Sequence, residues 1–306
     1  MEFTHPIRRR SRALKQLAVA ATQPRTLRRG VVVGTYWWAA QPNFGDDLTP
    51  WILPRYGVVP VHRRAPEARL AAVGSILEVL PSEYDGAIWG SGLIMDRPHP
   101  LPSAKILAVR GHLTRERIGA PDDVTLGEPG LLVARRIRRP ARRWDVGLVP
   151  HAVHRDHAAF VGLAETPGIR AHVIDVQRTA SHAVRQIAAC DVILTTSLHG
   201  LVVADAFGIP ALWTQLEPPL GGGSFKFHDY ESVITPNTTR FAAFDDRATL
   251  QDLMAQAAPA PRSTVDSVSD GLETALARLP EVLGALPPFP RGIPEVIAGQ
   301  ADRASR

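Results

Sequence analysis

Residues 191–213 read DVILTTSLHGLVVADAFGIPALW and contain a strand, a turn, a helix and a second strand in succession. The apolar run Asp191–Thr196 predicts a buried strand, and Gly200–Phe207 predicts an Ala/Val-rich helix. Gly208-Ile209-Pro210 ends that helix, and Ala211–Trp213 predicts the next strand. Two strands joined by a crossover helix indicate a parallel sheet in an α/β protein.

The same rhythm extends outward in both directions along the chain. In the first half, strands are expected at Val31–Trp37, Val58–His62, Leu70–Val73, Ala87–Trp89, Lys105–Val109 and Val124–Leu126. In the second half, strands are expected at Trp144–Val149 and Ile169–Val176, and helices at Ala152–Leu163, Ser181–Ala189, Leu250–Ala257 and Val265–Leu279. Two such α/β halves that face each other bind ligands in a central cleft, at the carboxyl ends of their strands.

Composition and charge divide the chain further. A chain of 306 residues that is 45% hydrophobic supports one large or two medium domains, and excludes a coiled coil, a collagen-like chain and a wholly disordered protein. We expect a basic leader (1–30), an N-terminal α/β domain (31–134), an Arg-rich linker (135–143), a C-terminal α/β domain (144–285) and a flexible tail (286–306).

The basic charge gathers in the leader. Residues 1–30 contain eight basic residues and one acidic residue, a net charge of +7, so the rest of the chain carries −2. A near-neutral body argues against nucleic-acid binding. Basic residues beside Ala13, Leu17 and Val19 suit a short amphipathic helix on an anionic membrane surface, and a solvated leader fits equally well.

Cysteine usage and hydropathy indicate the compartment. Cys190 is the one cysteine, so no disulfide can form within the chain, which fits a reducing compartment. No apolar run approaches the roughly 20 residues of a membrane span, and Leu17–Ala21 is too short for a signal-peptide core. We therefore expect a soluble, cytoplasmic protein, with membrane contact confined to the leader if it occurs.

His199 is the foremost candidate for chemistry. It lies in the turn Ser197-Leu198-His199-Gly200, which leads from a strand into a helix. Backbone amides and the positive end of the helix dipole favour an anion there, and a histidine can exchange a proton near neutral pH. The alternative is a histidine that only caps the helix.

The first strand–helix turn supplies a candidate base. In the segment QPNFGDDL (41–48), Gly45 permits a tight turn and Asp46 lies beside the next helix start, with Asn43 close by. The carboxylate of Asp46 either orients or deprotonates a hydroxyl group, or it caps the helix.

Two further strand ends carry candidates for anion binding. Gly90-Ser91-Gly92 follows a strand, where small residues admit a ligand or form a plain turn. Arg110 follows the next strand and could clamp a carboxylate or phosphate, or form a surface ion pair.

The second half adds three more candidates. His151 closes a strand and begins the series His151, His154 and His157, whose spacing drifts around a helix, so we expect no metal site. Lys226 follows three glycines in a loop that either binds an anion or lies idle on the surface, and Asp229 lies three residues later.

Taken in order, several motifs resemble the polysaccharide pyruvyl transferase family, in its bacterial exopolysaccharide branch. The motifs are NFGDDL (43–48), WGSGL (89–93), AVRGHLTRERIG (108–119), LGEPGLL (126–132), VPH (149–151), CDVILTTSLHGLVVADAFGIPAL (190–212) and SFKFHDY (224–230). Ser197 and Gly111 depart from the Arg and Asp that many relatives have there. Because this chain has Ser197 at the arginine position, the anion contact that the arginine could make must here come from Arg110 or Lys226.

The resemblance implies a GT-B-like fold of two Rossmann-like domains whose parallel sheets face a central cleft. It implies phosphoenolpyruvate as donor, no cofactor, and transfer to a sugar in a polysaccharide repeat unit, lipid-linked or free, to give a pyruvate ketal and phosphate. For this chemistry we expect His199 to be the general acid, or to protonate the departing phosphate, and Asp46 to be the base, while Asp229 and His151 orient the acceptor. Arg110, Lys226 and the amides near His199 and Gly90–Gly92 would hold the donor.

Two other function classes stay open. A nucleotide-sugar glycosyltransferase of the same fold needs an acidic residue for the ribose, and Glu217 is the available candidate. A carbohydrate-binding protein without catalytic activity would turn over no donor.

Overall fold

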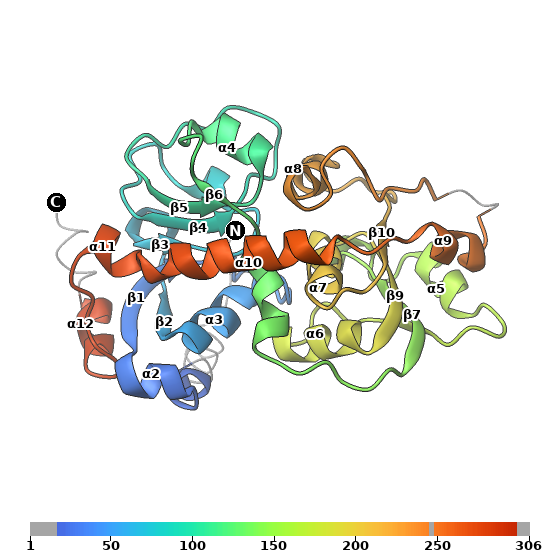
Figure 1. Ribbon diagram of the computed structural model, residues 1–306, viewed down its shortest axis with the longest axis horizontal. Coiled ribbons are helices and arrows are strands. Elements are labelled where there is room, and N and C mark those ends of the chain that lie inside the picture. Colours follow the sequence, from blue (N-terminus) through green and yellow to red (C-terminus); the bar gives the residue numbers. More distant parts are fainter. Residues whose placement is uncertain (1–16, 245–247, 299–306) are drawn as a thin grey trace.

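The computed structural model describes residues 17–244 and 248–298, and these residues build two parallel β-sheets (Figure 1). The first sheet has the strand order β2-β1-β3-β4-β5-β6 and the second β10-β9-β7-β8. Every strand pair in them is parallel. The predicted α/β class with parallel sheets is therefore confirmed.

The strands have the following bounds: β1 (Val31–Tyr36), β2 (Val58–His62), β3 (Leu70–Ala71), β4 (Ala87–Ser91), β5 (Lys105–Val109), β6 (Thr125–Leu126), β7 (Trp144–Val149), β8 (Ala171–Val173), β9 (Cys190–Thr195) and β10 (Ala211–Trp213). Strands β2, β5, β7 and β10 coincide with the ranges expected from sequence. Strand β8 is shorter than expected, since its pairing with β7 covers only three residues.

The α-helices are α2 (Pro24–Arg29), α3 (Leu48–Ile52), α4 (His112–Ile118), α5 (Ala158–Ala164), α6 (Ala180–Ala188), α7 (Leu198–Ala206), α8 (Phe225–Ile234), α9 (Leu250–Gln256), α10 (Arg262–Ala277), α11 (Leu279–Leu283) and α12 (Gly292–Ala298). Short 3₁₀ turns are η1 (Leu53–Tyr56), η2 (Ala65–Glu67), η3 (Leu77–Val79), η4 (Pro129–Arg135) and η5 (Ala152–His154).

The helix expected at Ala152–Leu163 is instead two pieces, η5 and α5. His151 accepts a hydrogen bond from the amide of Val153, and His157 accepts one from the amide of Ala159. Two successive side-chain caps therefore begin two separate helical segments.

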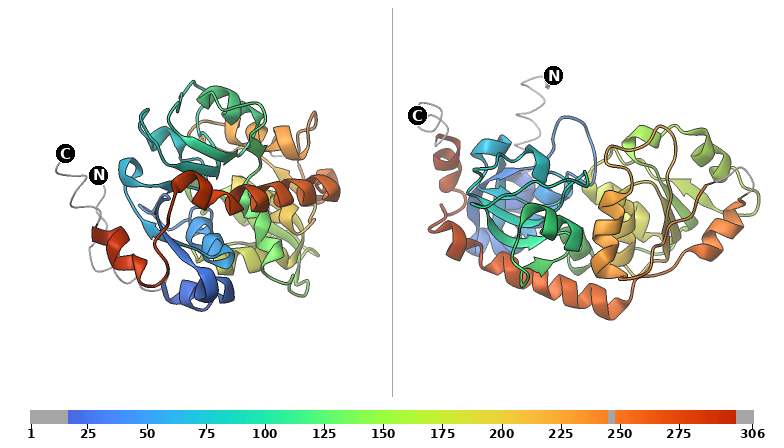
Figure 2. Two further views of the ribbon diagram at one scale, coloured as in Figure 1. Left: turned by 60° about the vertical axis from the view of Figure 1, so that its left-hand side comes forward. Right: turned by 90° about the horizontal axis from the view of Figure 1, so that it is seen from above.

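Helix α10 corrects the expected domain division. It follows the second sheet in the chain but packs on β4 and β5 of the first (Figures 1 and 2). The indole of Trp89 donates a hydrogen bond of 2.9 Å to the carbonyl oxygen of Leu272 in this helix. The range 144–285 is thus not one separate structural unit, because its last helices cover the first sheet.

The expected flexible tail is also partly ordered. Within 286–298, α12 packs against β1 and β2, and the amide of Val32 donates to the carbonyl of Pro287 at 2.8 Å. These contacts tie the segment to the edge of the first sheet. The tail's last residues, 299–306, lie outside the described residues.

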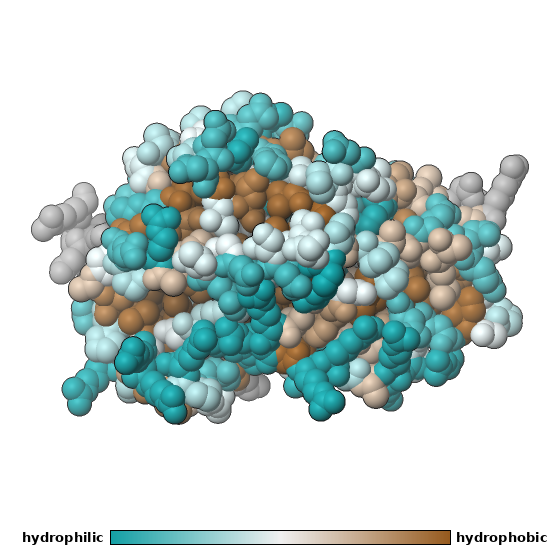
Figure 3. Space-filling view, viewed as in Figure 1, coloured by the Kyte–Doolittle hydropathy of each residue, from teal (hydrophilic) through white to brown (hydrophobic). Residues whose placement is uncertain are grey.

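The leader is described only from residue 17 onward, so the predicted amphipathic helix lies largely outside the described residues. Ala20, with Leu17, packs against Val32 and Val59 of the first sheet. Within 17–244 and 248–298, no helix has the length and apolar character needed to cross a membrane. Figure 3 shows a mostly hydrophilic face with scattered hydrophobic patches, as is ordinary for a globular surface.

A buried ion-pair network fastens α7 to α8 and to the segment that follows it. Arg240 donates to both carboxylate oxygens of Asp205, at 2.5 and 2.9 Å, and Tyr230 donates to the same carboxylate at 2.8 Å. Arg240 also pairs with Glu231 at 3.2 Å. Asp205 and Arg240 are both buried, so either charge would be left uncompensated in the interior without the other.

Removing one partner of this network should therefore destabilise the fold strongly. Asp205→Ala leaves the guanidinium of Arg240 buried and unpaired, so we expect a loss of about 3–5 kcal/mol in the free energy of unfolding. Urea denaturation followed by circular dichroism measures it. Arg178→Ala, which breaks an exposed ion pair with Asp175, is the control and should cost less than about 1 kcal/mol. Equal losses would show that the buried network is not a main support.

Candidate functional site

A cavity of about 510 Å³ lies at the strand ends of both sheets. Its lining residues follow β1, β3, β4, β7, β8 and β9, and include the start of α8. The volume falls in the range of small-molecule sites, roughly 300–1,000 Å³. Seven of the predicted site residues line it: Asn43, Asp46, His151, Ser197, Leu198, His199 and Lys226.

His199 reaches this cavity from the first turn of α7. The turn before it is fixed by Thr195, whose hydroxyl donates to the carbonyl of Val149 at 2.8 Å and accepts from the amide of Ser197 at 2.8 Å. A Cβ at Gly200 would lie 2.4 Å from that hydroxyl oxygen, so only glycine lets the helix begin this close to β9. The amino end of a fully buried helix thus faces the cavity.

Asp46 is held beside His199 by its own turn. Asn43 donates to a carboxylate oxygen of Asp46 at 2.8 Å, and the amide of Gly45 donates to the Asn43 side chain at 3.1 Å. A Cβ at Gly45 would lie 2.0 Å from Nδ1 of His199, so the glycine makes room for the imidazole. Burial raises the pKa of Asp46 to about 6, against the opposing charge of His199.

Lys226 supplies a buried positive charge at the start of α8. Its side chain is 7% exposed, lines the cavity and has no hydrogen-bond or ion-pair partner within the described ranges. Burial, aided by the nearby charge of Arg110, lowers the pKa of the ammonium group to about 8. An unpaired, buried ammonium that faces a cavity is suited to bind an anion.

His151 faces the same space as a neutral ring. Burial and the charge of Lys226 lower its pKa to about 3. Because its Nδ1 accepts from the amide of Val153 at 3.3 Å, the neutral ring carries its proton on Nε2. His151 is therefore a hydrogen-bond donor toward a ligand.

The other two histidines of the series are engaged elsewhere. His154 contacts the hydroxyl of Thr196 at 3.0 Å and the carbonyl of Pro218 at 2.9 Å, and His157 caps α5. Within the ranges that the structure describes, no group of three His, Cys, Asp or Glu side chains is arranged to hold a metal ion.

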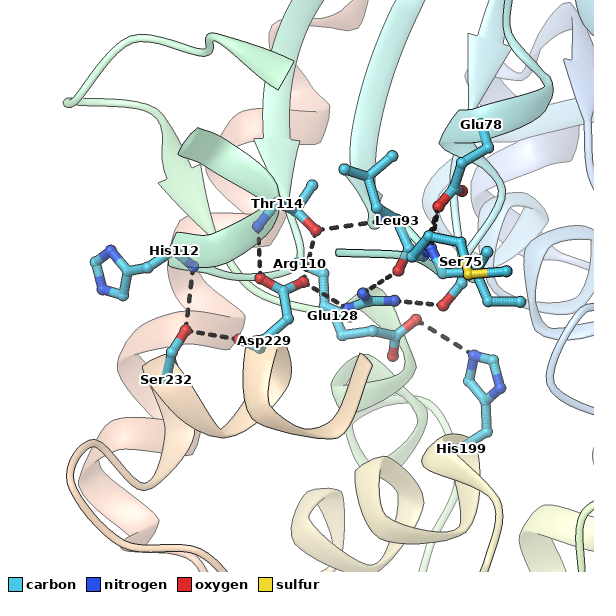
Figure 4. A network of polar contacts seen from close by, with 12 residues as sticks. Ser75, Glu78, Leu93, Arg110, His112, Thr114, Glu128, His199, Asp229 and Ser232 are labelled. Atoms are coloured by element: carbon cyan, nitrogen blue, oxygen red, sulfur yellow. Dashed lines mark hydrogen bonds and ion pairs between the residues drawn. The ribbon is translucent and has the colours of Figure 1, made fainter. Parts of the chain in front are cut away.

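Arg110 and Asp229 do not line the cavity, contrary to their predicted roles as substrate contacts. They form a fully buried ion pair of 2.7 Å with each other (Figure 4). Arg110 also donates to Ser75 and to the carbonyl of Leu93, while Asp229 accepts from the amide and hydroxyl of Thr114 at 2.7 and 2.6 Å. The pair therefore joins α8 to β5 and α4, and holds Lys226 and Ser75 in place at the cavity.

Five predicted small residues, Gly45 beside His199 among them, pack inside the protein instead of lining the cavity. Gly90 has a φ of 77° and lies against Pro129, and a Cβ at Gly92 would lie 2.3 Å from the guanidinium carbon of Arg110. Ser91 donates to the carbonyl of Ala72. Gly200, described above, completes the set. These residues shape the walls by close packing.

Sequence reasoning missed Glu128, a fully buried carboxylate behind the cavity. Its Oε1 lies 3.7 Å from Nε2 of His199 (Figure 4). The available signal was its place directly after the strand Thr125–Leu126, inside the motif LGEPGLL. Trp38 and Gln177 also line the cavity, and their sequence context carries no comparable signal.

Comparisons with known proteins show what the chain is similar to. The family model described as polysaccharide pyruvyl transferase matches residues 100–214. The succinoglycan biosynthesis protein ExoV of Rhizobium meliloti (strain 1021) is 28% identical over 213 residues, which are 65% of this chain and 64% of that protein. The uncharacterized protein L143 of Acanthamoeba polyphaga mimivirus is 29% identical over 171 residues, 53% of this chain and 58% of that protein.

The matched region thus spans less than two thirds of the length of these relatives. Among solved structures, the functional uncharacterized protein KP1_0663 from Klebsiella pneumoniae subsp. pneumoniae NTUH-K2044 aligns with a TM-score of 0.41 and 12% identity, covering 76% of this chain and 98% of that one. The family match over residues 100–214 and the similarity to ExoV confirm the resemblance to the polysaccharide pyruvyl transferase family that the motifs carry.

Proposed function

We propose that the protein transfers the enolpyruvyl group of phosphoenolpyruvate to two hydroxyls of a sugar in an exopolysaccharide or cell-surface glycan repeat unit. The product is a pyruvate ketal, and phosphate is released. The observation that carries the proposal is the meeting of Lys226, His199 and Asp46 in one cavity. The match to the family model and the similarity to ExoV, whose name places it in succinoglycan biosynthesis, support it.

The donor carries a carboxylate and a phosphate, so its site must supply positive charge and N–H donors. Lys226 provides an ammonium group that forms no ion pair within residues 17–244 and 248–298. Nε2–H of His151 and the free amides in the first turn of α7 provide donors. We place the donor among these groups. The cavity would then correspond to the central cleft of a GT-B-like fold.

The reaction needs one proton at carbon and loses two from hydroxyls. Protonation of the donor's methylene carbon leaves an oxocarbenium-like centre, which the oxygen of the first sugar hydroxyl attacks while its proton passes to a base. The carbon–oxygen bond to phosphate then breaks, and the second hydroxyl closes the ring and loses its proton. The two protons released equal the one added to carbon and the one taken by phosphate.

His199 and Asp46 have the placement for these proton transfers. His199 acts as general acid toward the donor, at the amino end of α7 where the developing phosphate charge is stabilised. Asp46, with a pKa of about 6, is ionised at neutral pH yet basic enough to take a hydroxyl proton. None of these steps is an oxidation or a reduction.

The glycosyltransferase alternative loses its candidate residue, because Glu217 is exposed and does not line the cavity. The acceptor's attachment to a lipid, the contact of residues 1–30 with an anionic membrane and a cytoplasmic location stay predictions.

Removing either proton-transfer group should slow turnover. We expect His199→Ala and Asp46→Asn each to lower kcat by about 10²–10⁴-fold, the usual contribution of general acid–base catalysis. Phosphate release from phosphoenolpyruvate and ketal formation, detected by mass spectrometry with oligosaccharide repeat units as acceptor, measure it. His182→Ala, an exposed histidine on α6, is the matched control and should keep full turnover. Full activity of His199→Ala would refute its assigned role.

The pH profile of kcat/KM should be bell-shaped. Activity rises through about pH 6 as Asp46 loses its proton, and falls through about pH 8 as Lys226 loses its charge. In Lys226→Arg the positive charge persists to higher pH, so the alkaline limb should move upward while the acidic limb stays. An alkaline limb that does not move in this variant would remove Lys226 from the donor site.

Ligand-induced stabilisation separates donor classes without any acceptor. A ligand present at about 100 times its Kd stabilises the folded state by about 2.7 kcal/mol. We expect phosphoenolpyruvate to raise the melting temperature of the wild type but not of Lys226→Ala. Stabilisation by nucleotide-sugars alone would favour the glycosyltransferase.

A further inference from the structure

Glu128 and His199 form an incomplete pair in the interior. Oε1 of Glu128 and Nε2 of His199 are both buried, and neither has a hydrogen-bond partner among the residues that the structure describes. They lie 3.7 Å apart, slightly beyond hydrogen-bond distance (Figure 4). Buried polar atoms are seldom left without partners, since each costs about 1–3 kcal/mol. Here the two unpartnered atoms face each other, and a small movement would join them.

Glu128 is held rigidly in this position. Its other oxygen, Oε2, accepts a hydrogen bond of 2.7 Å from the amide of Gly130 at the start of η4. A Cβ at Gly130 would lie 2.4 Å from that oxygen, so the glycine permits the cap. With Oε2 engaged by the backbone, Oε1 is the oxygen directed at His199. The carboxylate is 0% exposed, so bulk water does not reach it.

Other charged and titratable groups also surround the pair. Asp46 and His151 also act on His199 from the cavity side, and Lys226 acts on both of those residues. Tyr230 faces Glu128 from α8, but its hydroxyl donates to Asp205. The ion pair of Glu128 within the described residues is with His199.

We propose that Glu128 is a positioning residue for the transfer, whose carboxylate accepts Nε2–H of His199 and stabilises the imidazolium. This fixes the ring's tautomer and leaves Nδ1 as the nitrogen that gives its proton to the ligand. After that transfer the ring is neutral, with its remaining proton on Nε2 toward Glu128. The inference rests on the proposed function for its catalytic consequence, but the state of the ring can be observed in the free protein.

Nitrogen-15 NMR of histidine-labelled wild-type protein gives a test that needs neither variant nor substrate. The chemical shifts of the two ring nitrogens report which one carries the proton. We expect the neutral His199 ring to be protonated on Nε2. A neutral ring protonated on Nδ1 would overturn the proposal, whatever the protein's activity.

Glu128→Gln tests the carboxylate. Its amide oxygen can still accept from Gly130, which turns the NH₂ group toward His199, so Nε2 must accept and the neutral ring should carry its proton on Nδ1. Glu273→Gln is the control, because that carboxylate pairs with Arg135 and Arg136 away from the cavity and should leave the nitrogen-15 shifts of His199 unchanged. Unchanged nitrogen-15 shifts of His199 in Glu128→Gln would contradict the proposal.

Kinetics then separate positioning from folding. Glu128→Gln should lower kcat by at least about tenfold while the KM for phosphoenolpyruvate changes little, and should add nothing to His199→Ala in the double variant. Glu128→Asp, which keeps the charge, should retain more activity than Glu128→Gln. A fully additive double variant would show that Glu128 acts independently of His199. Failure of every variant and the wild type to turn over donor would instead refute the proposed function, with the NMR result standing by itself.

Discussion

The buried ion pair between Arg110 and Asp229 is the contact on which the arrangement of the site depends. It joins α8, from the second half of the chain, to β5 and α4 in the first. Asp229 lies three residues after Lys226 on α8, so the two side chains share a face of that helix. The pair that anchors the helix therefore also directs Lys226 into the cavity, and the charge of Arg110 helps to lower the pKa of Lys226.

Burial gives the remaining groups their chemistry. The carboxyl of Asp46 is harder to ionise, and the ammonium of Lys226 and the ring of His151 are harder to protonate, because each is removed from water. At neutral pH the site therefore contains the ionised carboxylate of Asp46, the protonated ammonium group of Lys226 and the neutral ring of His151. A trianionic donor can therefore pair with the ammonium group of Lys226, which no carboxylate of the described residues fully neutralises.

Much of the fold could be predicted from sequence, since its strands are short apolar runs ended by polar or turn residues. The turn Ser197–Gly200 was placed correctly for the same reason. Arg110 was misjudged because a clamp for an anion and half of a buried pair look alike in sequence. Its partner Asp229 lies 119 residues away along the chain, and only tertiary packing brings them together.

The role of α10 and the contact of Glu128 were hidden for a related reason. The sequence of an amphipathic helix does not show which sheet the helix covers. Helix α10 packs on the first sheet, although it follows the second sheet in the chain. Glu128 follows a two-residue strand, and its relation to His199 depends on how η4 packs on α7. Local pattern predicts where a side chain leaves the backbone, whereas its partner is set by the packing of distant segments.

The most direct measurement is a crystal structure of the wild-type protein with phosphoenolpyruvate. The account predicts the phosphate or carboxylate within hydrogen-bond distance of Lys226 and the first amides of α7, with the enol carbon beside His199. A donor bound elsewhere, or a cavity that stays empty of it at saturating concentration, would contradict the account.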